Sequence, residues 1–85
     1  MGRSDPNEIH QKLILASETV QVGAIYRHRV RGDLYRVVLL TMREEDVVPA
    51  VIYVPVEGPA IPWDRKITVF LERFHRVEEL AAPTS

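Results

Sequence analysis

Aromatic, imidazole and guanidinium side chains form the set of residues in this chain that is best suited to bind a ligand. They gather in residues 23–40, GAIYRHRVRGDLYRVVLL, and recur in two later segments. Aromatic faces and guanidinium groups bind planar groups, peptides and anions by stacking and forked hydrogen bonds. We therefore predict a ligand-binding surface made of Tyr26, Arg27, His28, Tyr53, Trp63 and Arg65. The alternative, in which these rings only fill the core of a small barrel, stays open.

Four arginines, Arg27, Arg29, Arg31 and Arg36, form a locally basic cluster. Such a cluster could contact the phosphates of a nucleic acid. The whole chain, however, has a formal net charge of -1 and a pI of about 6.3, whereas a general polyanion binder carries a basic excess. Nucleic acid is therefore the less favoured partner, and a solvated face paired with acidic residues across strands is the favoured explanation of the cluster.

His28 is the residue that could act as a general base near neutral pH. No serine or carboxylate lies near it in a recognisable triad pattern, and the chain has no cysteine. The three histidines are too scattered to suggest metal ligands. We predict no catalytic residue, no metal and no cofactor, and we keep a hydrolase-type enzyme using His28 beside Arg65 as a further alternative.

The composition predicts one small domain with one core. The chain has 85 residues, of which 46% are hydrophobic. The absence of cysteine excludes a disulfide framework. No apolar run is long enough for a membrane span or a signal peptide, so we expect a cytoplasmic protein without a membrane partner.

A helix is predicted in residues 5–18. Asp5 can cap it, and Pro6 suits its first position. Its apolar stripe includes Ile9 and Leu13, and so short a helix is marginal unless this stripe docks. The stripe could dock on the rest of the chain or on a second copy, which would make a homodimer.

Short strands are predicted after the helix. They form a domain at 23–78. A disordered start at 1–4 and the helix at 5–18 precede it, and a C-terminal tail at 79–85 follows it. The predicted strands span 25–30, 34–41, 47–56, 63–67 and 74–77, with a single helical turn at 68–71. Gly32 and Asp33 supply the first turn. Short strands in so small a domain predict a strongly bent sheet or a partly closed five-stranded barrel.

The second strand is predicted to be central and covered on two sides, because residues 37–40 are apolar on both faces. The residues predicted to fill the core are Tyr35, Val37, Leu39, Ile52, Val54, Ile67 and Phe70.

The order of these motifs resembles that of a small bacterial family, domain of unknown function 1653. The residues that carry the resemblance are Tyr26-Arg27-His28, Gly32, Tyr35-x-Val37, Val51-Ile52-Tyr53, Trp63-x-Arg65 and Phe70-Leu71-Glu72. They cover most of residues 23–77. The resemblance implies an SH3-like barrel and does not imply an activity.

The chain departs from that family's pattern at three places. Residues 29–31 look one residue longer than the family's spacing, and a β-bulge near the turn could absorb the extra residue. Lys66 stands where a proline usually follows the closing arginine, and residues 58–62 are rich in proline rather than glycine. The shape of any ligand pocket beneath that loop is therefore not implied by the resemblance.

These observations favour a non-enzymatic binding or adaptor module. Its partner would be a protein or small molecule that offers a peptide, a planar group or an anion to the aromatic and arginine surface.

Overall fold

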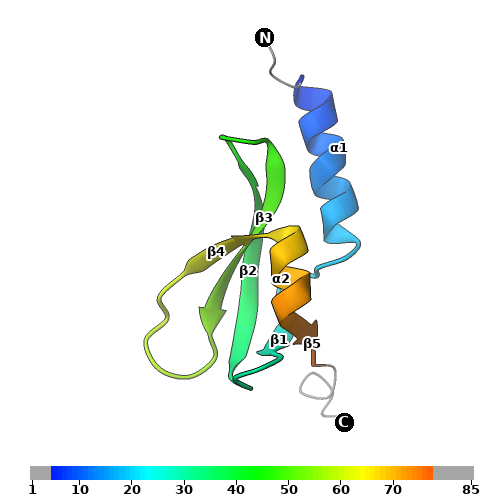
Figure 1. The fold of residues 1–85 in the computed structure, drawn as a ribbon. Coiled ribbons are helices and arrows are strands. Elements are labelled where there is room, and N and C mark those ends of the chain that lie inside the picture. Colours follow the sequence, from blue (N-terminus) through cyan, green and yellow to red (C-terminus); the bar gives the residue numbers. More distant parts are fainter. Residues whose placement is uncertain (1–4, 78–85) are drawn as a thin grey trace.

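The chain folds into one antiparallel sheet with two helices. A computed structural model describes residues 5–77, so the predicted start at 1–4 and the tail at 79–85 lie outside the described residues. The elements follow in the order α1 (Pro6–Ser17), β1 (Ile25–His28), β2 (Leu34–Arg43), β3 (Val48–Pro55), β4 (Trp63–Lys66), α2 (Ile67–Arg73) and β5 (Phe74–Arg76) (Figure 1). The predicted mainly β class with an N-terminal helix is confirmed.

Helix α1 begins where the sequence predicts and docks on its own sheet. The Asp5 carboxylate accepts a hydrogen bond from the Glu8 backbone N–H at 2.9 Å. Figure 1 shows α1 beside the upper half of the β2–β3 hairpin. The Lys12 ammonium donates to the Val47 carbonyl at 3.0 Å, at the tip of that hairpin. Ala16 is the buried residue of the helix.

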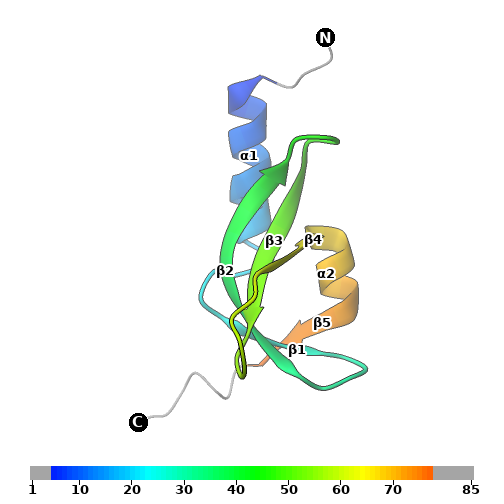
Figure 2. The same ribbon diagram turned by 90° about the vertical axis from the view of Figure 1, so that its left-hand side faces the viewer.

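The sheet has the strand order β4-β3-β2-β1-β5, and all its pairs are antiparallel. Among residues 5–77 no ladder joins β4 to β5, so the sheet is not closed into the expected barrel. The two edge strands are very short, and α2 connects them in the place where further pairing would be needed (Figure 2). Phe70 of α2 is fully buried and fills the space under this connection.

The turn between β1 and β2 is longer than predicted. β1 ends at His28, and residues 29–31 form the turn. The His28 carbonyl accepts from the Gly32 N–H at 2.9 Å, and the His28 N–H donates to the Asp33 carbonyl at 2.9 Å. Gly32 has a φ of 86°, which glycine adopts without a steric penalty. Residues 29–31 therefore lie in the turn, and the register of the β1–β2 ladder from Ile25 to Arg27 shows no bulge.

A bulge does occur, in the middle of β2. The register of β2 against β3 shifts between Val37 and Leu39, and such a shift exchanges the inner and outer faces of a strand. Leu39 is consequently 45% exposed, whereas Leu40 packs against the core. Val38 is also exposed. The prediction that β2 is covered on two sides is wrong, although β2 does lie at the centre of the sheet.

The core lies between the inner face of the sheet, α2 and the end of α1. Its buried members are Ala16, Val20, Tyr26, Val37, Val51, Tyr53, Ile67, Phe70 and Phe74. Val37 pairs with Tyr53 across the ladder, so Val51 and Tyr53 share the inner face of β3. Ile52 and Val54, which were predicted to be core, are only half-buried on the opposite face.

Salt bridges join the hairpin tip to β4. The Arg43 guanidinium lies 3.4 Å from the Asp46 carboxylate and 3.7 Å from that of Asp64, and Lys66 lies 3.1 Å from Asp46. The hydrogen bond from Lys66 lowers the pKa of Asp46 below its ordinary value. These groups are exposed enough for each pair to contribute little to stability.

Neither helix in the described part of the chain has both the length and the apolar character needed to cross a bilayer.

Candidate ligand-binding site

A hollow of about 240 Å³ opens beside β4 and contains the clearest convergence of aromatic and guanidinium groups. The residues that line it are Arg31, Tyr35, Tyr53, Trp63, Arg65 and Phe74. We call it the Trp63 hollow. Three of the six predicted site residues do not line it, and three residues that were not predicted do.

The β3–β4 ladder places three of the predicted residues together. Tyr53 pairs with Trp63, and Arg65 lies two residues farther along β4, on the same face as Trp63. The Arg65 Nε donates to the Tyr53 hydroxyl at 3.2 Å. Trp63 is 54% exposed, whereas Tyr53 is buried. The indole is therefore accessible to a ligand, and the guanidinium beside it is held in position.

The floor of the hollow is a set of rings that meet edge to face. Tyr35 contacts Tyr53 with ring centroids 5.3 Å apart and Phe74 with centroids 5.4 Å apart. Tyr53 and Phe74 are also 5.3 Å apart. Edge-to-face pairs of this kind add to the stability that area burial gives. The floor is thus built of rings packed against one another.

The second guanidinium of the hollow is fixed by an acid and a phenol. The Arg31 Nε and Nη2 each lie 3.3 Å from an oxygen of the Asp33 carboxylate. Nη2 also donates to the Tyr35 hydroxyl at 3.0 Å, and that hydroxyl donates to Asp33 at 2.8 Å. Nε and Nη2 of Arg31 are therefore engaged by Asp33 and Tyr35, and Nη1 lies 3.2 Å from Nε2 of His28.

These contacts shift the pKa values of Asp33 and Tyr35. The hydrogen bond from Tyr35 is the largest cause that lowers the pKa of Asp33, and Arg31 acts in the same direction. Burial, followed by the hydrogen bond to Asp33, raises the pKa of Tyr35. Asp33 is therefore ionised and Tyr35 neutral at pH 7, and the carboxylate orients Arg31.

His28 lies behind the hollow, between Arg31 and Phe74. It is 5% exposed, and its ring meets Phe74 edge to face at 5.0 Å. Its Nδ1 accepts from the backbone N–H groups of Val30 and Arg31 at 3.3 and 3.1 Å. Its Nε2 lies 3.2 Å from Arg31 Nη1. Burial is the main cause that lowers the pKa of His28, and Arg31 lowers it further. His28 is therefore a neutral ring at pH 7.

Tyr26 and Arg27, also predicted for the site, lie away from the Trp63 hollow. Tyr26 is buried in the core, where its ring meets Phe70 with centroids 5.1 Å apart. Arg27 is on the opposite face of β1 and donates to the Gly32 carbonyl at 3.0 Å. The alternation of a strand separates neighbouring residues in this way.

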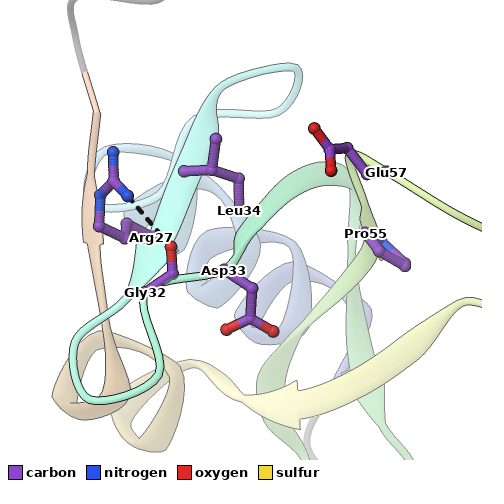
Figure 3. A pocket seen from close by; sticks show the side chains of 6 residues that line it. All are labelled: Arg27, Gly32, Asp33, Leu34, Pro55 and Glu57. Atoms are coloured by element: carbon purple, nitrogen blue, oxygen red, sulfur yellow. Dashed lines mark hydrogen bonds between the residues drawn. The ribbon is translucent and has the colours of Figure 1, made fainter.

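Arg27 lines a second hollow, of about 400 Å³, on that opposite face. Figure 3 shows its lining residues, Arg27, Gly32, Asp33, Leu34, Pro55 and Glu57. The guanidinium of Arg27 and the carboxylate of Asp33 point in different directions in this view. The hollow lacks aromatic rings, and its charged groups do not converge on one point. We therefore place the candidate site at the Trp63 hollow.

The four arginines of the basic cluster do not share one surface. Arg27 and Arg36 lie on the outer face of the sheet, because Arg36 pairs with Ile25, two residues before Arg27. Arg29 donates to the Leu71 carbonyl at 3.2 Å, toward α2. Arg31 turns to the Trp63 hollow. The turn at residues 29–31 disperses side chains that a continuous strand would have aligned.

Arg31, Tyr35 and Phe74 are the lining residues that the sequence did not indicate as site residues. Tyr35 was predicted as core and Arg31 as part of the basic cluster. The pattern Arg31-x-Asp33-x-Tyr35 contains the signal: three groups able to bond one another around a turn. No comparable sequence pattern marks Phe74, because β5 lies beside β1 only in the folded structure.

Within residues 5–77 no three histidine, aspartate or glutamate side chains are grouped so that they could hold a metal ion.

Searches against protein-family models, curated proteins and solved structures find no match to this chain.

Proposed function

We propose that this protein is a non-enzymatic binding module whose Trp63 hollow takes a planar apolar group that carries an anion. The observation that carries the proposal is the arrangement of four aromatic rings and two arginines around one hollow. Guanidinium groups supply forked donors to carboxylates and phosphates, and exposed aromatic faces stack on planar groups.

The dimensions of the hollow limit the size of the ligand. A volume of about 240 Å³ is below the usual range for drug-sized ligands, roughly 300–1,000 Å³. It suits one side chain of a peptide with a nearby carboxylate, or a small aromatic acid. A long polymer would have to lie across it rather than in it.

The charges around the hollow support an anionic ligand. Asp33 is the carboxylate that faces Arg31, and its oxygens engage Nε and Nη2, which leaves Nη1 without an acidic partner among the contacts described. The Nε of Arg65 donates to the Tyr53 hydroxyl. An anion in the hollow would therefore meet the charge of Arg65 and the Nη1–H of Arg31, whose own charge is paired with Asp33.

We also propose that the domain is SH3-like and related to domain of unknown function 1653, and that it works in the cytoplasm. The antiparallel meander from β1 to β4, followed by the return of β5 to the side of β1, supports this assignment. The sequence motifs named above provide the remaining support.

The fluorescence of Trp63 tests the proposed function directly, because it is the only tryptophan in the chain. Phenylacetate, titrated at constant ionic strength, should change the emission with a Kd on the order of 1–10 mM, as expected for a fragment. The neutral isostere phenylacetamide should bind more weakly.

Two arginine variants locate the binding. Arg65→Gln should weaken phenylacetate binding by about 10-fold, because a hydrogen bond to a charged group is lost. Arg36→Gln is the matched control on the outer face and should leave the Kd unchanged. An emission that responds to neither probe, or equal Kd values in both variants, would contradict the proposed function.

A further inference from the structure

Both ring nitrogens of His28 face hydrogen-bond donors of the chain. A neutral imidazole carries a proton on one ring nitrogen and a lone pair on the other. The Nδ1 lone pair is already used, because the backbone N–H groups of Val30 and Arg31 both point at it. The proton must therefore lie on Nε2.

The neighbour of that proton is a donor and not an acceptor. Nε2 lies 3.2 Å from Nη1 of Arg31, and a guanidinium has no acceptor atom. Two N–H groups thus face the same region, and an acceptor oxygen between them would satisfy both. Arg31 cannot easily turn away, because Asp33 and Tyr35 hold its other nitrogens.

We propose that the Nε2–H of His28 and the Nη1–H of Arg31 together receive one oxygen of a ligand's oxyanion, a carboxylate or a phosphate monoester. This assignment rests on the proposed function, since Arg31 and Phe74, which enclose His28, both line the Trp63 hollow. His28 acts here as a neutral donor, and its burial keeps it from carrying a competing charge.

The site formed in this way has a defined polarity. The oxyanion lies at the His28 end, and the planar part of the ligand extends along the ring floor toward the exposed Trp63. Arg65, beside Tyr53, can contact the second oxygen. The module would thus select a terminal or side-chain acid attached to a flat group, and reject the amide of the same shape.

Two substitutions of His28 distinguish the role of Nδ1 from that of Nε2. In His28→Asn the side-chain oxygen can still accept from the turn, but no donor reaches the Nε2 position. In His28→Gln an amide N–H can reach that position. We expect His28→Asn to weaken phenylacetate binding by about 10-fold, with phenylacetamide unaffected, and His28→Gln to recover most of the loss. Thermal melting of each variant checks that it is folded.

Ring-nitrogen NMR of wild-type protein with ¹⁵N-labelled histidine gives a readout that needs no variant. It should report a proton on Nε2 of His28 in the free protein, and a shift of that N–H resonance when phenylacetate is added. Phenyl phosphate, as a second probe, shows whether the oxyanion is better matched by a carboxylate or a phosphate; either result supports the proposal.

The experiments distinguish a failure of this inference from a failure of the proposed function. If the probes bind with the dependence on Arg65 described above, but His28→Asn keeps the preference for acid over amide, the proposed function stands and this inference is overturned. A proton found on Nδ1 would also overturn it. If no probe changes the Trp63 emission, the proposed function fails and this inference fails with it.

Discussion

His28 is the residue at which the stability of the fold and the candidate site meet. Its backbone closes the β1–β2 turn through Gly32 and Asp33, and its ring is buried against Phe74. Four charged groups act on it from three elements: Arg31 and Asp33 in the turn, Arg65 on β4 and Arg73 on α2. Burial and the three arginines disfavour the imidazolium, and only Asp33 opposes them.

Acidification should therefore destabilise the protein through His28. Its pKa in the folded state is lowered from the ordinary value of 6.5, mainly by burial. The contribution of the neutral ring to the free energy of unfolding is fully present above the pKa that His28 has in the unfolded chain. It is lost as the pH falls below about 6.5 toward the lower pKa of the folded state. The urea concentration at the unfolding midpoint should therefore be lower at pH 5.5 than at pH 7.5.

The His28→Asn variant is the control for this pH effect. It keeps an acceptor for the turn but has no titrating ring, so its midpoint should change less between the same two pH values. Asp33, whose pKa is also lowered, contributes a further loss only at more acidic pH, below about its ordinary value of 3.8. An equal slope in the wild type and the variant would contradict the role given to His28.

At the residue scale, the sequence could indicate types of chemistry but not which groups meet. The structure brings three of the predicted residues, Tyr53, Trp63 and Arg65, to one hollow, because β3 and β4 are adjacent strands. The sequence could not show that Tyr26 and Arg27 lie elsewhere, because their separation depends on which face of β1 is buried. The three-residue pattern from Arg31 to Tyr35 became visible as one cluster only when the turn was placed.

At the scale of elements, the bulge in β2 determines which leucine belongs to the core. Strict alternation from Val37 predicts Leu39 inside, whereas the register shift places Leu40 there. A bulge inserts one residue without an obvious sequence signal, since no glycine or proline marks it here. The sequence therefore predicted the strand correctly, but the faces of the residues after Val37 incorrectly.

A pair of alanine substitutions tests the bulge. Leu40→Ala should lower the free energy of unfolding by about 1–2 kcal/mol, because a partly buried leucine loses its core contacts. Leu39→Ala, the matched change on the exposed side, should alter it by no more than about 0.5 kcal/mol. Urea denaturation followed by circular dichroism measures both, and the reverse order of the two effects would show that the register is unshifted.

Ala16 is the buried residue of α1 and belongs to the hydrophobic core. Ala16→Glu places an unpaired charge in the contact between helix and sheet and should cost more than about 2 kcal/mol. Gln11→Glu, on the exposed side of the same helix, should cost no more than about 0.5 kcal/mol. Equal unfolding midpoints would mean that α1 is not held on the sheet as described.

At the scale of the whole molecule, different elements lie at the two ends of an elongated domain. Its principal extents are 48 × 26 × 21 Å, and Figure 1 shows α1 with the hairpin tip at one end and the β1–β2 turn with β5 toward the other. An apolar groove of about 450 Å³ runs between α1, the hairpin tip and α2. The Trp63 hollow is lined by a separate set of residues.

The homodimer that the sequence suggested through α1 stays a prediction. Ile14 and Leu15 of the helix are exposed at 41% and 61%, and Leu15 lines the apolar groove. If the helix forms the contact, light scattering should give twice the 9.8 kDa of one chain, and Leu15→Glu should return the mass to that of the monomer. A monomeric mass for the unchanged chain would rule this dimer out.

Whole-molecule architecture followed from the sequence as far as the strand count and order along the chain. Five strands and an N-terminal helix were predicted, and all are present. The predicted closure of the sheet is not found among residues 5–77, because β4 and β5 do not pair. Both are short, and α2 lies between them in the chain.

A crystal structure of the full chain with phenylacetate would test the central claim most directly. The account predicts the carboxylate within about 3 Å of the guanidinium nitrogens of Arg31 and Arg65, with the ring against Trp63. Phenylacetate seated instead in the apolar groove beneath α1, or in the hollow beside Arg27, would contradict it.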